Sequence, residues 1–89
     1  MQHLNIIVYG TVQGVGFRRA AIQKARHLNI TGFIRNETDG SVFIEAEGNR
    51  SGLAGFVEWC KTGPVYADVK EVKVKEESLK NYTSFDPGY

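Results

Sequence analysis

Cysteine and histidine are scarce in this sequence, and each shortage excludes something. The 89 residues include one cysteine, Cys60, so no disulfide can form within the chain and packing must stabilise the fold. The two histidines, His3 and His27, are isolated, and Cys60 has no partner at ligand spacing. No Ser/His/Asp arrangement stands out either. We therefore expect neither a metal site nor a nucleophilic triad.

An excess of one charge and a long apolar run are also missing. The net charge is +1, which gives no electrostatic reason to expect a nucleic acid or an acidic membrane as partner. No run approaches the roughly 18 apolar residues of a transmembrane helix. The first ten residues lack the charged start and apolar stretch of a signal peptide. The simplest expectation is a cytoplasmic monomer.

The remaining composition describes one ordinary domain, residues 1–89. Hydrophobic residues make up 42% and charged residues 24%, as in a soluble globule, and the length suffices for a single core. No linker, low-complexity segment or repeat divides the chain.

The hydrophobic pattern predicts four main strands and two helices. Residues 4–9 alternate as a strand, and a helix follows from Phe17 to a left-handed Asn29. The expected order then continues with strand 31–36, a hairpin at Asp39-Gly40, strand 41–48, a helix ending at Gly63-Pro64, strand 66–74 with a bulge near Lys70-Glu71, and a short fifth strand around Phe85. This βαββαβ order predicts a ferredoxin-like α+β sandwich, an antiparallel sheet with both helices on one face.

The stretch "GTVQGVGFRR", Gly10–Arg19, joins the first strand to the first helix. Glycines let backbone N–H groups turn inward and let a ligand approach closely. The helix start adds unpaired N–H groups and a positive dipole end, and arginine adds a permanent charge. Together these features predict a cradle for a phosphate-like anion.

Asn36 is expected at the same edge of the sheet as this loop. The first two strands should run parallel with the third strand between them, so both end at one rim. Two strand spacings amount to roughly 10 Å. An arginine from the loop and Asn36 could therefore converge on one ligand.

Two common phosphate motifs do not fit. Gly14 and Gly16 begin a dinucleotide fingerprint, but Arg19 stands where its third glycine belongs. The Gly-Lys-Ser/Thr of a Walker loop is absent.

The motifs "YGTVQGVGFRR", "GFIRNETDG" and "GPVYADV", in this order, resemble the acylphosphatase family from Leu4 to Tyr89. The resemblance implies a ferredoxin-like enzyme that hydrolyses the carboxyl–phosphate anhydride of acyl phosphates without metal or organic cofactor. It implies that Arg18 is the catalytic phosphate-binding arginine and that Asn36 positions the attacking water. The phosphate-binding loop would use the backbone of Gln13, Gly14, Val15, Gly16, Phe17 and Arg18. Asn29 replaces a glycine common in relatives, and "FDPGY" carries an unusual Pro-Gly; neither touches Arg18 or Asn36.

The expected chemistry agrees with a site of this kind. A carboxylate is a weak base that leaves without a proton, so the site needs no general acid. It must hold a dianion and place a water in line, which amides, one arginine and one asparagine can do. Inorganic phosphate, the product, should then bind the same loop as an inhibitor.

Three other functions remain as alternatives. Tyr9 and Phe43 could stack RNA bases on the open face of the sheet, although Glu45 and Glu47 share the face with Phe43 and no RNP-type motif occurs. A related domain begins the hydrogenase-maturation carbamoyltransferases, but the chain ends too early for such an enzyme. The third alternative is a non-catalytic anion sensor. Among single residues, Phe17 is expected in the core, Arg19 on the surface, and Gln13 as loop filler.

Overall fold

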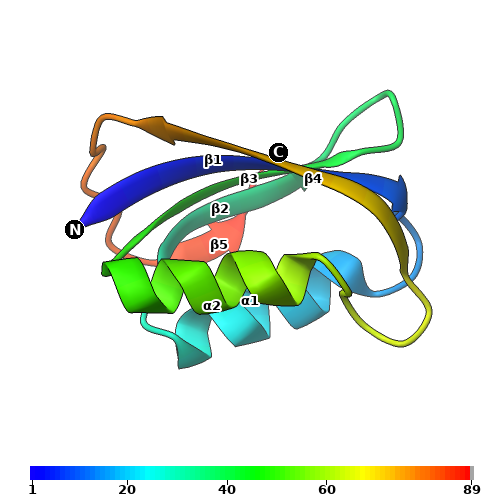
Figure 1. The fold of residues 1–89 in the computed structure, drawn as a ribbon, viewed down its shortest axis with the longest axis horizontal. Helices are drawn as coiled ribbons and strands as arrows, with labels where there is room; N and C mark the ends of the chain where they lie inside the picture. The colour runs from blue at the N-terminus through cyan, green and yellow to red at the C-terminus, as the bar shows by residue number, and fades with distance from the viewer. Residues whose placement is uncertain (89) are drawn as a thin grey trace.

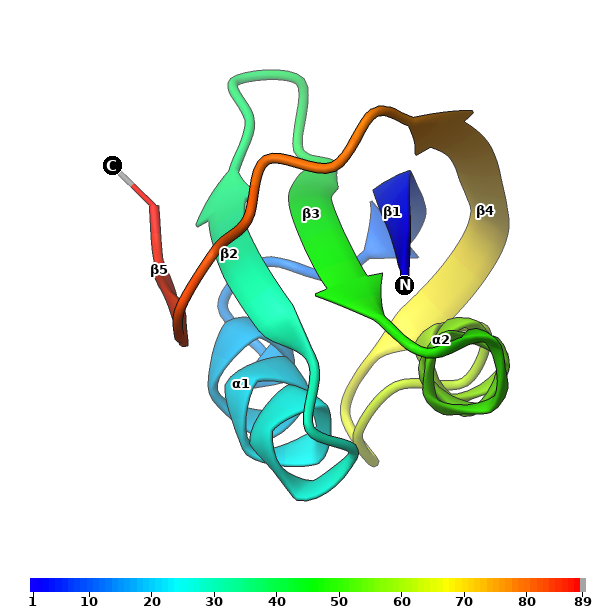
Figure 2. The ribbon, with the colours of Figure 1, turned by 90° about the vertical axis from the view of Figure 1, so that its left-hand side faces the viewer.

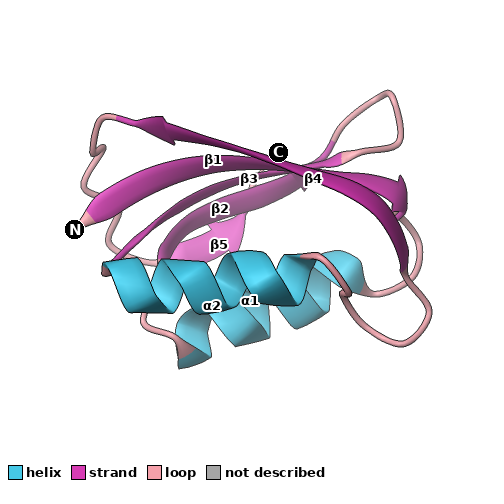
Figure 3. Cartoon of the chain, viewed as in Figure 1, coloured by secondary structure: helices cyan, strands magenta, loops and turns pink. Residues whose placement is uncertain are grey.

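Two helices cover one face of a five-stranded sheet in the computed structural model, which describes residues 1–88 (Figure 1; Figure 3). The predicted βαββαβ order is confirmed, and a short fifth strand follows it as expected. Tyr89, where the resemblance ends, lies outside the described residues. The elements are β1 (Gln2–Thr11), α1 (Phe17–His27), β2 (Thr31–Asn36), β3 (Val42–Gly48), α2 (Arg50–Cys60), β4 (Asp68–Glu77) and β5 (Phe85–Pro87).

The sheet is mixed, so the expectation of an antiparallel sheet is wrong at one edge. Its order is β4-β1-β3-β2-β5, and within residues 1–88 only the pairing of β2 with β5, which aligns Gly32 with Phe85, is parallel. The reason lies in the connection. The last residue of β4 lies at the same end of the strands as the first residue of β2, and residues 78–84 cross from β4 to the opposite lateral edge, beyond β2 (Figure 2). Because β5 begins at the end of the sheet where β2 also begins, it must run in the same direction as β2.

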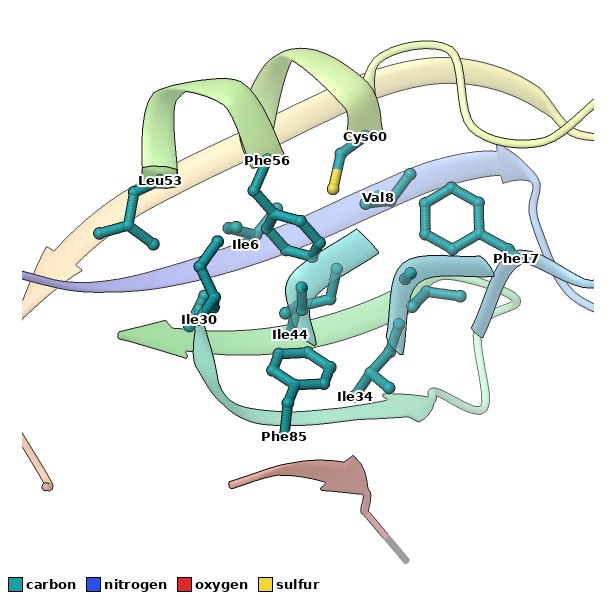
Figure 4. Packing of buried hydrophobic residues seen from close by; sticks show 14 of the residues in the cluster. Ile6, Val8, Phe17, Ile30, Ile34, Ile44, Leu53, Phe56, Cys60 and Phe85 are labelled. Atoms are coloured by element: carbon teal, nitrogen blue, oxygen red, sulfur yellow. The ribbon is translucent and has the colours of Figure 1, made fainter. Parts of the chain in front are cut away.

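The core lies between the sheet and the helices. Alternate residues of β1 and β3, Ile6, Val8 and Ile44 among them, face the helices and are fully buried (Figure 4). Burial of this kind contributes about 25 cal/mol per Å² of apolar surface. The buried side chains that the helices and β5 add to this core are Phe17, Ala21, Ala25, Leu53, Phe56, Cys60 and Phe85.

Local backbone features agree with the pattern of the sequence. Asn29 has φ 58°, the left-handed conformation expected after α1. Tyr9 pairs with Glu71 while Gly10 pairs with Val69, so the register shifts at the predicted bulge. The start of α2 is fixed by Asn49, whose side chain accepts a hydrogen bond of 2.7 Å from the Gly52 N–H.

A buried polar cluster occupies the face of the sheet opposite the helices, where residues 78–84 cross it. His3, which the sequence marked as isolated, is fully buried, with Nδ1 2.7 Å from Glu47 Oε2. Glu47 also accepts from the backbone N–H groups of Lys80 and Tyr82, and the Tyr82 hydroxyl donates to Glu45 at 2.8 Å. The cluster ties the C-terminal segment to the sheet. Among residues 1–88, no helix has the length and apolarity needed to cross a membrane.

Candidate functional site

The loop between β1 and α1 has the backbone geometry of an anion cradle. Gly14 and Gly16 have φ values of 74° and 80°, a left-handed region that other residues adopt only at a cost. A Cβ at either position would meet nothing within 4 Å, so neighbouring atoms do not explain the glycines. The two glycines are therefore needed for the left-handed backbone conformation of the loop.

The N-terminus of α1 is left open. Its N-cap is Gly16, which offers no side chain, and the first turn holds no acidic residue. Within residues 1–88, the backbone N–H groups of residues 14–19 have no hydrogen-bond acceptor. Most helices satisfy such groups with a Ser, Thr, Asp or Asn cap. This row of unpaired donors, at the positive end of a helix dipole, is suited to a bound anion.

The structure brings Arg18 and Asn36 together beside this row. Arg18 is the second residue of α1, and its exposed guanidinium forms no ion pair within the described chain. Asn36 is the last residue of β2, also exposed, and pairs with Val42 of β3. Both line one pocket of about 180 Å³, whose lining residues are Val12, Gly14, Gly16, Phe17, Arg18, Arg19 and Asn36.

The other loop residues serve in different ways. Phe17 is buried as expected, and its ring packs against Trp59 with centroids 5.3 Å apart. Val15 is half-buried against the core. Arg19, interpreted from the sequence as a surface residue, is exposed but also lines the pocket. It adds a second positive charge near the open helix end.

Comparison with known proteins agrees with this arrangement. The acylphosphatase family model matches residues 4–87. The chain belongs to the acylphosphatase family. An acylphosphatase of Archaeoglobus fulgidus is 44% identical over 86 residues, 97% of each chain. The crystal structure of the Bacillus subtilis acylphosphatase superposes with a TM-score of 0.97 at 39% identity and full coverage of both chains. The Coxiella burnetii acylphosphatase gives 0.95 at 33% identity, covering 98% of this chain and 92% of its own.

Membership of the acylphosphatase family makes this chain a hydrolase that acts on acyl phosphates.

The sequence analysis did not predict the role of one side chain near the pocket, that of Gln13. This amide contacts the turn between β2 and β3 and does not merely fill the loop. Its acceptors are backbone carbonyl oxygens, which every type of residue has, so the sequence of the turn does not indicate the contact. The one signal in the sequence is the position of Gln13 just after β1.

A larger hollow lies elsewhere, on the open face of the sheet. It measures about 690 Å³ and is lined by Ile7, Phe43, Lys73 and neighbouring residues. Two aromatic rings of this face already make cation–π contacts: the Arg35 guanidinium lies 4.9 Å from the centre of the Phe43 ring, and the Lys73 ammonium lies 5.5 Å from that of the Tyr9 ring. These contacts count against base stacking and hence against the RNA-binding alternative.

The pocket beside Arg18 and Asn36 is lined by no His, Cys, Asp, Glu, Ser or Thr residue in the part of the chain that the structure describes. In the part of the chain that the structure describes, no three His, Cys, Asp or Glu residues are arranged to hold a metal ion. Cys60 lies in the core, and burial raises the pKa of its thiol to about 12, so it stays protonated and inert.

We expect Gly14→Val to weaken inhibition by inorganic phosphate at least tenfold while barely changing thermal stability. A β-branched side chain at φ 74° is strained by about 1–3 kcal/mol, and the uncrowded loop will relieve the strain by changing shape. The matched control is Gly14→Asn, because asparagine tolerates the left-handed region. Equal phosphate inhibition constants for all three proteins would show that the loop shape is not required.

Proposed function

We propose that the loop amides and Arg18 hold the phosphoryl group of an acyl phosphate while Asn36 orients the attacking water. The products are a carboxylate and inorganic phosphate, and no metal takes part. The observation that carries this proposal is that Arg18, Asn36 and residues of the loop with unpaired N–H groups line one pocket.

The residues of the pocket match the demands of this leaving group. No Asp, Glu, His or Cys is among the lining residues, so the pocket offers no general acid. A carboxylate needs none, because it departs as a stable anion. The water oxygen bonds to phosphorus, the bond from phosphorus to the acyl oxygen breaks, and its electron pair leaves with the carboxylate. One proton of the water passes to a phosphoryl oxygen and the other stays on the new hydroxyl.

Charge stabilisation then falls to the cradle. In phosphoryl transfer the negative charge is spread over the three equatorial oxygens, and preorganised donors aimed at them lower the barrier. The backbone N–H groups of residues 14–19 supply such donors from fixed positions, and the Arg18 guanidinium adds donors with a permanent charge. Asn36 stands on a different strand, which lets it hold the water apart from the phosphate ligands.

The test is hydrolysis of benzoyl phosphate by the purified protein, with and without EDTA. We expect the same rate in both, and a rate at least a hundredfold lower with p-nitrophenyl phosphate, whose phenoxide is a poorer leaving group than a carboxylate. Loss of activity in EDTA with recovery on adding Mg²⁺ would refute the metal-free mechanism.

Inhibition by phosphate, a monomeric state and a cytoplasmic location also belong to this proposal. Support for inhibition comes from the cradle, which fits the product as well as the substrate. Support for a cytoplasmic location comes from the single, buried cysteine, which forms no disulfide within the chain. Size-exclusion chromatography tests the monomer.

A further inference from the structure

Gln13 bridges two segments that lie far apart in the sequence. It follows β1 by two residues and is half-buried. Its Nε2 donates to the carbonyl oxygen of Glu37 at 2.8 Å and to that of Ser41 at 2.9 Å. Because both partners only accept hydrogen bonds, the nitrogen of the amide must be the atom that faces them.

The two carbonyls belong to the residues that close the turn between β2 and β3. The Glu37 N–H donates to the Ser41 oxygen at 2.9 Å, and the Gly40 N–H donates to the Glu37 oxygen at 3.2 Å. Inside the turn, Ser41 donates to Asp39 from both its N–H and its hydroxyl, which lowers the pKa of that carboxyl. The turn is therefore held by its own hydrogen bonds, and Gln13 links the start of the cradle loop to it by two more.

Asn36 immediately precedes this turn. Its side chain makes no hydrogen bond within residues 1–88, so its position depends on the backbone that carries it. The strands that carry the two halves of the pocket, β1 and β2, do not pair with each other, because β3 lies between them. Gln13 supplies a direct connection between the two halves at the rim.

We propose that Gln13 is a positioning residue, which sets the distance between the phosphate cradle and the water held by Asn36. This inference rests on the proposed function. A misplacement of about 1 Å between reacting groups can cost about 10²-fold in rate, so two hydrogen bonds that fix this distance act on turnover. The cradle amides belong to residues 14–19, the last three of them in α1, so we expect phosphate binding to depend little on the connection.

The first variant is Gln13→Met, which keeps the length of the side chain and removes both donors. We expect kcat for benzoyl phosphate to fall about 10- to 100-fold, with the inhibition constant of phosphate within twofold of wild type. The matched control is Gln23→Met on the exposed face of α1, which should leave both constants unchanged. Circular dichroism verifies folding, and Gln13→Asn, which is too short to reach both carbonyls, replaces Gln13→Met if that variant unfolds.

The decisive measurement is the double variant with Asn36→Ala. If Gln13 acts through Asn36, adding Gln13→Met to Asn36→Ala should lower kcat less than threefold further. An equal loss of kcat in both backgrounds, or a phosphate inhibition constant that weakens as much as kcat falls, overturns the inference. Wild-type kcat in Asn36→Ala alone would instead reject the proposed function, and this inference with it.

Discussion

Asn36→Ala should lower kcat for benzoyl phosphate by about 10²–10³ and leave inhibition by inorganic phosphate nearly unchanged. The proposed contact of Asn36 is with the water, which matters in the transition state, whereas phosphate is held by the loop. Arg18→Ala should fail differently, with slower turnover and weaker phosphate inhibition together, because the guanidinium meets the phosphoryl group in both states. The measurements are kcat and the phosphate inhibition constant of each variant.

Both side chains are exposed at the rim, so both variants should fold, as circular dichroism would verify. Arg50→Ala is the charge-matched control, since Arg50 is exposed at the start of α2 at the opposite end of the sheet (Figure 1). Near-normal kcat in a folded Asn36→Ala protein would show that Asn36 only precedes a turn and has no role in catalysis. The water would then have to be positioned by another group.

Glu47→Ala should cost about 3 kcal/mol of unfolding free energy without touching the pocket. The carboxylate is 2% exposed and accepts hydrogen bonds from His3 and from the backbone N–H groups of Lys80 and Tyr82. Its removal leaves these donors buried without a partner, which is costly. Glu58→Ala, on an exposed part of α2, is the control and should change stability by less than about 0.5 kcal/mol. Urea unfolding of each protein measures the difference.

The same carboxylate should make stability depend on pH at the acid end. Burial alone would raise the pKa of Glu47, but the backbone N–H groups and His3 outweigh it and hold the pKa below its ordinary 4.5. Since the folded pKa is the lower one, the contribution is present above about pH 4.5 and is lost as the pH falls through the folded pKa. Glu47→Gln should therefore show a flatter loss of stability below about pH 4.5. An unchanged acid limb would place the acid sensitivity in other carboxyls, with Glu45 the first to examine.

The parts of the fold that the sequence predicts correctly are those with a local cause. Alternation marks Ile6 and Val8 as inward, and an asparagine after a helix marks the left-handed turn at Asn29. The switch of apolar parity in β4 marks the bulge beside Tyr9. The convergence of Arg18 and Asn36 on one pocket also follows from local motifs plus the handedness of a crossover.

The features that were missed depend on contacts between distant residues. His3 and Glu47 are 44 residues apart, and the segment that covers them, "SLKNYTS", has no periodicity to indicate where it lies. The parallel pairing of β5 follows from the path of that same segment. Gln13 donates to backbone carbonyl oxygens, which every residue possesses, so the side chains of the turn do not indicate the contact in the sequence.

The open start of α1 links occupancy of the pocket to folding. A glycine in place of a capping side chain forgoes about a few tenths of a kcal/mol of stability, so the empty protein is slightly less stable than its helix could make it. On the proposed function, the substrate or the product becomes that cap. Because only the folded loop can bind phosphate, each tenfold rise in phosphate above its Kd adds about 1.4 kcal/mol to the free energy of unfolding. The protein would then be hardest to unfold in solutions rich in its own product.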